Sequence, residues 1–547
     1  MSKFGEMSAS VPPQYAPTPE ALNFGNGLFV LGNTGSFMDA VVTFSKAQPV
    51  AVTVTVLLLS FVLYQATGKK SSHLPVFNPQ PLSKKYNPAN RLKLGAETKD
   101  NLIAGRKKYG PDQIFTINGL AGELIVVPAR FINEIRNDKD LSPQDAKRTA
   151  HSTIPGFEPF DDVSTMLTPI VNKYINKVLG KLTKMLSDET NIALNKKLGE
   201  STEWREIKPN SDLLPIVSRL STRVFMGEKM CDNEEWLRVS SEYTNLVFPM
   251  VGDLFRYPNL LTRQLVHHFL PGCKEVRAAL DRCRKTLQPV IDERKRAVAN
   301  AKKLGQEVPT WEDSLEWFRQ EFGDIDFATK QITMSMAAIH TTTDLLSETL
   351  VRIARHPEHL PALREEAVRV LSADGWKKTS LYNLRFMDSF IKEAQRMRPA
   401  LLATMQRVVT RDHKLSNGVL LKKNQMVIAD VTHMWESDYY QDPQTFDPYR
   451  FLRMRGTDKE HMAQLASTSE AHNGFGHGKY ACPGRFFAAN EIKILLCHMI
   501  LKYDWKMADE TREPRPLFIG LQIIGDPQLG LLLRKREPEI DLDAIEG

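Results

Sequence analysis

From about residue 90 to its end at residue 547, the chain has no linker, internal repeat or low-complexity stretch. The full length would allow about three or four average domains. A domain boundary, however, usually falls in a flexible, polar segment, which this part of the sequence lacks. We therefore expect residues 90–547 to form one large domain. A chain of this length can bury a sizeable core without disulfide bonds.

Helical periodicity dominates this body. Apolar residues recur at helical spacing along residues 332–355, and this segment ends just before Pro357, as helices do. Strand-like segments are few and cover residues 113–127, 408–428 and 520–533. The pattern predicts a mainly α fold with a minor β region.

The N-terminal region differs from the body. Residues 1–46 are rich in Gly, Pro, Ser and Asn and predict a flexible tail, whereas residues 47–66 carry no charge. That run has about the 20 residues that a single transmembrane helix needs. Lys69 and Lys70 follow it and favour a cytosolic location for the C-terminal side. Residues 67–89 contain several prolines and predict a stiff hinge.

Two alternatives compete with the transmembrane anchor. Val and Thr alternate at the start of the uncharged run, which is also typical of a buried β segment. A cleaved signal peptide is the other alternative, but the run begins too far into the chain and no basic segment precedes it.

Charge and cysteine usage exclude some classes of protein. The 72 Lys and Arg exceed the 65 Asp and Glu by a net charge of +7, and they are interspersed. A nucleic-acid-binding protein usually concentrates its positive charge, so we expect no nucleic-acid partner. An odd number of cysteines without a CxxC pair disfavours a zinc site or a disulfide framework and indicates a reduced, cytosol-facing body. The cysteines are Cys231, Cys273, Cys283, Cys482 and Cys497.

The most informative segment is Phe-Gly-His-Gly-Lys-Tyr-Ala-Cys-Pro-Gly-Arg-Phe-Phe-Ala at residues 475–488. Two glycines precede Cys482, Pro483 and Gly484 follow it, and a helical apolar period then begins. The pattern predicts a glycine-rich loop that presents a thiolate at the start of a helix. Backbone amides and the helix N-terminus would stabilise the charged sulfur there. Glycines also let a flat, bulky ligand approach the backbone closely.

Other interpretations of this segment are weaker. Cysteine is commonly a small buried hydrophobe, and we interpret the other four cysteines in this way. Gly476-x-Gly478-x-x-Ala481 is similar to a dinucleotide fingerprint, but polar residues precede it where a strand is required. Cys482 could also be a protease nucleophile, although no family-specific cysteine signature surrounds it.

The pattern Phe475-x-x-Gly478-x-x-x-Cys482-x-Gly484 resembles the haem-binding loop of the cytochromes P-450, the haem-thiolate monooxygenases. The resemblance implies a cytochrome P-450 fold, a haem b (iron protoporphyrin IX) cofactor, and Cys482 as the axial ligand of the haem iron. Phe475, Gly478 and Gly484 would then belong to the cofactor-binding loop.

The resemblance is incomplete where the family binds a haem propionate. The family usually has Arg or His two residues before the cysteine, and this chain has Tyr480, so Lys479 or another base would have to substitute. Many members also carry Trp-x-x-x-Arg on an earlier helix, but no tryptophan lies between residues 100 and 200. Arg407 lies where relatives often place a propionate-binding arginine.

Two further motifs follow in the family's order. Glu393-Ala-Gln-Arg396 is an ExxR pair, and its two charged residues share one side of a helix. By itself such a pair is most often an ordinary surface ion pair. Residues 446–451 then supply Arg450. In the family, the equivalents of Glu393, Arg396 and Arg450 form a buried structural triad.

The helical segment at residues 337–344 is similar to the family's oxygen-binding pattern. Mid-helix threonines are unfavourable, so a cluster of three requires a reason. The resemblance gives Thr341 the main role in hydrogen-bonding oxygen and relaying protons, with Thr342 beside it. His340 occupies the usual position of an acid and could relay protons near neutral pH. The alternative for His340 is a hydrogen-bonded helix residue that faces a neighbour.

The resemblance thus implies a membrane-anchored monooxygenase that inserts one oxygen atom from O₂ into a lipophilic substrate. The partners would be an NADPH-dependent flavoprotein reductase or a small haem electron donor, and the location the endoplasmic reticulum membrane with the catalytic domain facing the cytosol. The motif forms are most similar to those of fungal members that oxidise terpenoids or related secondary metabolites. Predicted pocket walls are residues 154–160, Met336, Ile339, 400–404 and 519–523.

Two other functions are compatible with a haem loop. Some relatives rearrange or dehydrate peroxides without a reductase, but they usually lack the helix threonine that Thr341 provides here. A non-catalytic membrane haem protein is the third hypothesis, and nothing in the sequence favours it.

Overall fold

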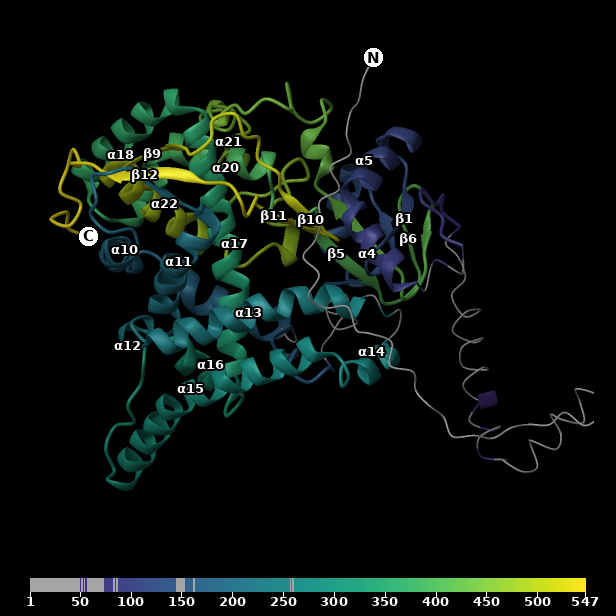
Figure 1. Cartoon of the computed structure of the whole chain (residues 1–547), viewed down its shortest axis with the longest axis horizontal. Helices are drawn as coiled ribbons and strands as arrows, with labels where there is room; N and C mark the ends of the chain where they lie inside the picture. The colour runs from purple at the N-terminus through teal and green to yellow at the C-terminus, as the bar shows by residue number, and fades with distance from the viewer. Residues whose placement is uncertain are drawn as a thin grey trace, which may run out of the picture. The chain divides into compact units, whose positions relative to one another are not determined.

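The computed structural model describes residues 73–81, 87–143, 153–160, 163–255 and 260–547, together with Val50, Thr53, Thr55, Val56, Lys84 and Tyr257. The chain divides into two units, residues 1–71 and 72–547, and the second contains all the elements below (Figure 1). The predicted tail and most of the predicted anchor lie outside the described residues. No helix within the described ranges is both long enough and apolar enough to cross a bilayer.

Helices make up most of the second unit, as the sequence predicts. The long ones are α10 (Leu182–Leu198), α11 (Pro209–Met226), α13 (Glu234–Phe255), α15 (Pro271–Lys303), α17 (Phe327–Arg355), α18 (Leu360–Asp374), α20 (Arg385–Met397) and α22 (Arg485–Lys502). The shorter ones are α4 (Pro88–Ala96), α5 (Thr98–Tyr109), α6 (Ile132–Ile135), α8 (Thr168–Ile170), α9 (Asn176–Val178), α12 (Glu228–Cys231), α14 (Leu260–Val266), α16 (Ser314–Phe322), α19 (Lys378–Asn383) and α21 (Glu460–Ala463).

Several single turns of other helical types connect these elements. The 3₁₀ turns are η1 (Ala129–Phe131), η2 (Glu158–Phe160), η5 (Pro357–His359), η6 (Thr432–Trp435), η7 (Leu452–Met454) and η8 (Gly478–Tyr480). Two turns are π-helical, η3 (Val163–Leu167) and η4 (Val171–Ile175), and they flank the short α8. Such wide turns are rare in proteins, and those that do occur are frequently found at functional sites.

Helix α17 confirms the predicted helix at residues 332–355 and is the central helix of the core. Its N-cap is Asp326, whose carboxylate accepts a hydrogen bond from the Thr329 amide at 3.1 Å. The helix ends at Arg355, because Pro357 disfavours a helical conformation for the residue before it. In Figure 1 α17 runs through the middle of the helical region, and it packs against α11, α15, α20 and α22.

The β structure is minor, so the predicted mainly α class is confirmed. The largest sheet has the order β1-β2-β8-β5-β3, and all its pairs are antiparallel except β2 with β8. Its strands are β1 (Phe115–Gly119), β2 (Gly122–Val126), β3 (Leu141–Ser142), β5 (Ala403–Val409) and β8 (Met426–Asp430). The smaller sheets contain β4 (Arg205–Ile207), β9 (Tyr503–Met507) and β12 (Leu531–Lys535), the pair β6 (His413–Lys414) and β7 (Leu420–Leu421), and the pair β10 (Leu517–Ile519) and β11 (Gln522–Ile524).

Part of the predicted hinge belongs to the largest sheet. Val76 forms a parallel bridge with Thr116 of β1. The Phe77 amide donates to the Thr116 carbonyl, and the Thr116 amide donates to the Pro75 carbonyl, both at 2.9 Å. This segment is therefore fixed to the sheet edge.

Candidate active site

Cys482 differs from the other four cysteines. It is exposed, whereas Cys231, Cys273, Cys283 and Cys497 are buried, and none forms a disulfide. Burial raises the pKa of the Cys231, Cys273 and Cys283 thiols to about 12, 11 and 12, respectively. Those buried thiols stay protonated at neutral pH. Cys482 is the cysteine whose side chain a ligand can reach.

The backbone around Cys482 is a tight loop. The Cys482 amide donates to the Phe475 carbonyl at 2.8 Å, and the Ala481 amide donates to the Gly478 carbonyl at 3.0 Å. Gly476 and Gly478 have φ values of 71° and 82°, which side-chain-bearing residues adopt rarely. A Cβ atom on Gly478 would also lie 2.7 Å from both the Arg136 Cβ and the Asn137 Oδ1. Both glycines are therefore required by the loop.

Helix α22 begins directly after this loop. Gly484 is its N-cap, and Arg485 is its first residue. The positive end of the helix dipole consequently lies beside Cys482, where it stabilises a thiolate.

Three separate segments hold the loop in place. Asn137, just after α6, accepts a hydrogen bond from the Lys479 amide at 2.7 Å. Asn176 at the start of α9 donates to the Pro483 carbonyl at 3.2 Å. Thr404 of β5 donates to the Asn473 carbonyl at 2.6 Å. The loop is thus positioned by contacts from distant parts of the chain.

Arg407 is buried next to the loop. Its Cζ lies 5.3 Å from the centre of the Tyr480 ring, and its Nη1 donates to the Gln406 carbonyl at 2.9 Å. Its Nε and Nη2 are buried and have no hydrogen-bond partner within the described residues. Burial lowers the pKa of Arg407 to about 10, so it remains a cation at neutral pH. Unsatisfied buried donors are costly, and a carboxylate bound by both nitrogens would satisfy them.

Glu393, Arg396 and Arg450 come together in the core. Arg396 donates to both carboxylate oxygens of Glu393 at 2.8 Å, and Arg450 Nε lies 3.2 Å from each of them. Glu393 and Arg396 have no exposed surface, which rules out the surface ion pair. Arg396 also donates to the Met434 and Pro443 carbonyls.

Thr341, Thr342 and His340 lie on α17. Most of this helix is buried, but Ala337 and Thr341, one turn apart, are exposed. The Thr341 hydroxyl donates to the Ala337 carbonyl at 2.9 Å, and Thr342 is buried. The exposed stripe gives this buried helix one face that a ligand can reach.

His340 has a neutral ring at pH 7, because burial lowers its pKa to about 4. The ring packs edge-on against Phe248 of α13, with centroids 6.2 Å apart. Phe248 in turn packs edge-on against Phe160 at 6.1 Å. Residues 154–160 are predicted to form a pocket wall, but Ile154 and Phe157 are fully buried in the core. Phe160 is the aromatic residue of this segment that is partly exposed.

Sequence reasoning missed two buried charged groups next to these motifs. Lys392 donates to the Met462, Gln464 and Ser467 carbonyls at 2.7, 2.7 and 2.9 Å. Arg398 donates to the Asp344 carboxylate at 2.8 Å and to Glu348, and so joins the end of α20 to α17. Lys392 directly precedes the ExxR motif and Arg398 lies two residues after it, but only burial distinguishes these residues from surface charges.

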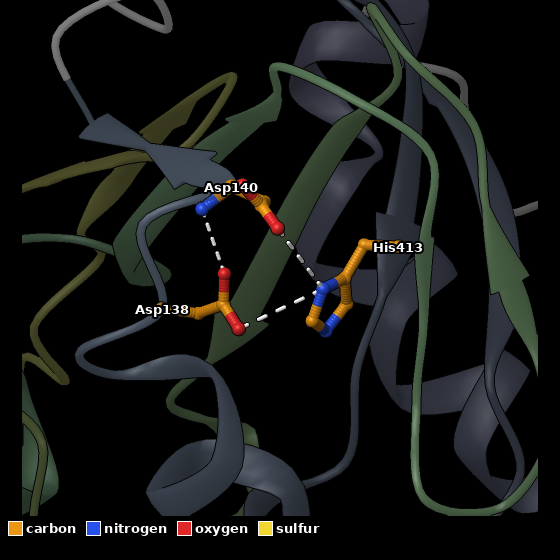
Figure 2. A group of neighbouring side chains, drawn as sticks. All are labelled: Asp138, Asp140 and His413. Carbon is orange, nitrogen blue, oxygen red and sulfur yellow. Dashed lines mark hydrogen bonds and ion pairs between the residues drawn. The ribbon is translucent and has the colours of Figure 1, made fainter.

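A second polar cluster lies at the edge of the largest sheet (Figure 2). His413 Nδ1 is 3.6 Å from Asp138 Oδ2 and 3.9 Å from Asp140 Oδ2, and Arg411 also pairs with Asp140. All three residues drawn are partly exposed. Contacts of His413 in β6 with the two aspartates of the turn before β3, together with the Arg411–Asp140 ion pair, account for the arrangement.

Comparison with known proteins gives one consistent result. The family model "Cytochrome P450" matches residues 161–530. The chain is 45% identical to the cytochrome P450 monooxygenase eqxH of Fusarium heterosporum, over 82% of this chain and 88% of that protein. It is 37% identical to the cytochrome P450 monooxygenase adrA of Penicillium rubens, over 92% and 99%.

The fold agrees with this result. The structure of retinoic acid-bound cyanobacterial CYP120A1 matches with a TM-score of 0.62 at 17% identity, over 85% of this chain and all of that one. The predicted cytochrome P-450 fold is thereby confirmed, and the family implies a haem-thiolate cofactor, a reductase and a small-molecule substrate. With the family model covering most of the body and relatives aligned along most of their length, the chain belongs to the cytochrome P450 family and is a monooxygenase of that family.

Proposed function

We propose that Cys482 is the axial ligand of the iron of haem b in this monooxygenase. The observation that carries the proposal is that Cys482 is the exposed cysteine, on a glycine-rich loop at the N-terminus of α22. When haem is bound, a thiolate ligand increases the electron density on the iron and favours cleavage of the O–O bond.

The residues around the loop fit the rest of the cofactor. Arg407 has two buried donors with no partner in the part of the chain that the structure describes, and these suit a propionate carboxylate. Tyr480 lies against its guanidinium. Tyr480 thereby occupies the position of the family's usual base. Phe475, Gly478 and Gly484 give the loop the backbone path that a flat ring requires. The triad of Glu393, Arg396 and Arg450 has a structural role.

Thr341 is the proposed proton-transfer residue on the oxygen side. Its hydroxyl is exposed and can donate one hydrogen bond while it accepts another. To donate toward a ligand, it must give up its bond to the Ala337 carbonyl. Thr342 and His340 are the proposed assisting residues. Because the His340 ring is neutral at pH 7, it would relay a proton by accepting one at one ring nitrogen and releasing another from the other.

For the substrate we propose a lipophilic terpenoid or related fungal secondary metabolite. Met336 and Ile339 of α17, predicted as pocket walls, are buried in the same core cluster as Ile154 and Phe157. The support for the substrate class is that the relatives named above are monooxygenases of fungi. Electrons would come from an NADPH-dependent flavoprotein reductase. For the organisation of the chain we propose a tail at 1–46, an anchor at 47–66, a hinge at 67–89 and one catalytic domain at 90–547, located at the endoplasmic reticulum membrane and facing the cytosol.

The test of the ligand is the carbon monoxide difference spectrum of the reduced haem protein. We expect the long-wavelength Soret band of a thiolate ligand in the wild type and in Cys497→Ala, and its loss in Cys482→Ala. An unchanged band in Cys482→Ala contradicts the assignment. Product formation that requires NADPH and reductase supports oxygen insertion, whereas turnover of a peroxide without them supports the isomerase or dehydratase alternative.

A further inference from the structure

Arg485 joins the cysteine loop to the segment that precedes it. Its Nη1 donates to the carbonyl of Cys482 at 2.8 Å, and its Nε donates to the carbonyl of Ala466 at 3.0 Å. One planar guanidinium therefore holds both backbone segments, which a single-point donor such as lysine cannot do in the same way.

The Ala466 side of this bridge is itself fixed. Lys392 donates to the Gln464 and Ser467 carbonyls on either side of it. The amide of Leu465 donates to Asp388 at 2.7 Å. Lys392 and Asp388 belong to α20 and are buried. The two hydrogen bonds of Arg485 consequently hold its guanidinium beside the cysteine.

The charge of Arg485 has no carboxylate partner among the described residues. Burial lowers the pKa of Arg485, whereas the negative charge of a Cys482 thiolate raises it. A half-buried cation with no carboxylate partner in the described part of the chain keeps much of its field, since solvent screens it less than it screens an exposed charge.

We propose that Arg485 raises the reduction potential of the haem iron by placing a fixed positive charge beside the Cys482 thiolate. The proposal rests on the proposed function, since it takes Cys482 as the axial ligand. Reduction of ferric to ferrous iron adds one electron, supplied by the reductase, and no proton, so the site becomes more negative by one charge. A nearby cation stabilises the reduced form more than the oxidised form, and net charge is one determinant of such potentials.

The experiment measures the reduction potential of the haem-loaded full chain by spectroelectrochemistry. In Arg485→Gln the potential should become more negative, by about a tenfold change in the reduction equilibrium, or about 59 mV for one electron. Arg485→Lys keeps the charge, so its reduction equilibrium should stay within about twofold of that of the wild type. Lys459→Gln removes one exposed positive charge from the loop before Ala466 and should leave the potential unchanged.

An unchanged potential in Arg485→Gln overturns the proposal. So does an equal shift in Arg485→Lys, because the contact geometry and not the charge would then be responsible. Arg485→Met is a second neutral variant for the case that the glutamine variant does not retain haem. The carbon monoxide difference spectrum distinguishes failure of the proposed haem ligand from failure of the proposed role of Arg485. If the wild type lacks the thiolate band, the proposed function fails, whereas a normal band with an unaltered potential removes only the role of Arg485.

Discussion

Glu393 and Arg396, one helical turn apart on α20, have no exposed surface and pair through two hydrogen bonds of 2.8 Å. Arg450 reaches the same carboxylate from a loop 54 residues after Arg396 in the chain, so one buried carboxylate pairs with two buried guanidinium groups. A buried ion pair is not by itself a source of stability, but loss of one partner leaves an uncompensated charge.

Glu393→Gln is therefore expected to destabilise the fold by about 3–5 kcal/mol, because Arg396 and Arg450 would stay buried without a counter-ion. Urea unfolding and the haem content of the purified protein measure the effect. Glu235→Gln breaks an exposed pair with Arg238 and should change the stability little. Equal effects of the two substitutions would contradict the buried triad.

Thr341→Val should retain haem but divert reducing equivalents to peroxide, since the exposed hydroxyl is lost while the shape of the side chain is kept. Thr343→Val is the matched control, because Thr343 makes the same kind of bond to Ile339 at 2.8 Å but is buried. The ratio of peroxide formed to NADPH consumed distinguishes them. A similar ratio in both variants would remove the special role of Thr341.

Folding stability should decrease as the pH falls from about 6.5 toward 4. Burial lowers the pKa of both His340 and His433 from 6.5 to about 4. Between these values the unfolded chain binds protons that the folded protein does not, so acid favours unfolding. Each histidine contributes at most about 3 kcal/mol to this loss. Urea unfolding at pH 7, 6 and 5 tests the effect, and His433→Gln should reduce the slope.

Lys392→Met should lower the stability by about 1–3 kcal/mol, because three buried carbonyls lose their donor while the cost of burying a charge is removed. It should also reduce haem retention, since residues 462–467 lead into the cysteine loop. Lys229→Met, at an exposed position, is the control. Thermal unfolding and haem content are the measurements. Full haem retention in Lys392→Met would show that the loop does not depend on this contact.

The sequence alone determined the features that are encoded locally. The helix at α17 followed from its apolar period and the proline after it, and the cysteine loop followed from glycines that a tight turn requires. The order of the ExxR, arginine and cysteine motifs predicted the family. Each single motif depends on residues that are close in the chain, and the order of the motifs is read directly from the sequence, so both are visible without a structure.

Only the tertiary structure decided which groups are buried and which are paired. It separated Cys482 from four buried thiols, placed Ile154 and Phe157 in the core, and brought Arg398 to acids about 50 residues away on α17. It also left two donors of Arg407 without partners among the described residues and fixed Arg485 between two carbonyls. Burial and charge pairing depend on contacts between distant segments, and no local period in the sequence records which segments meet.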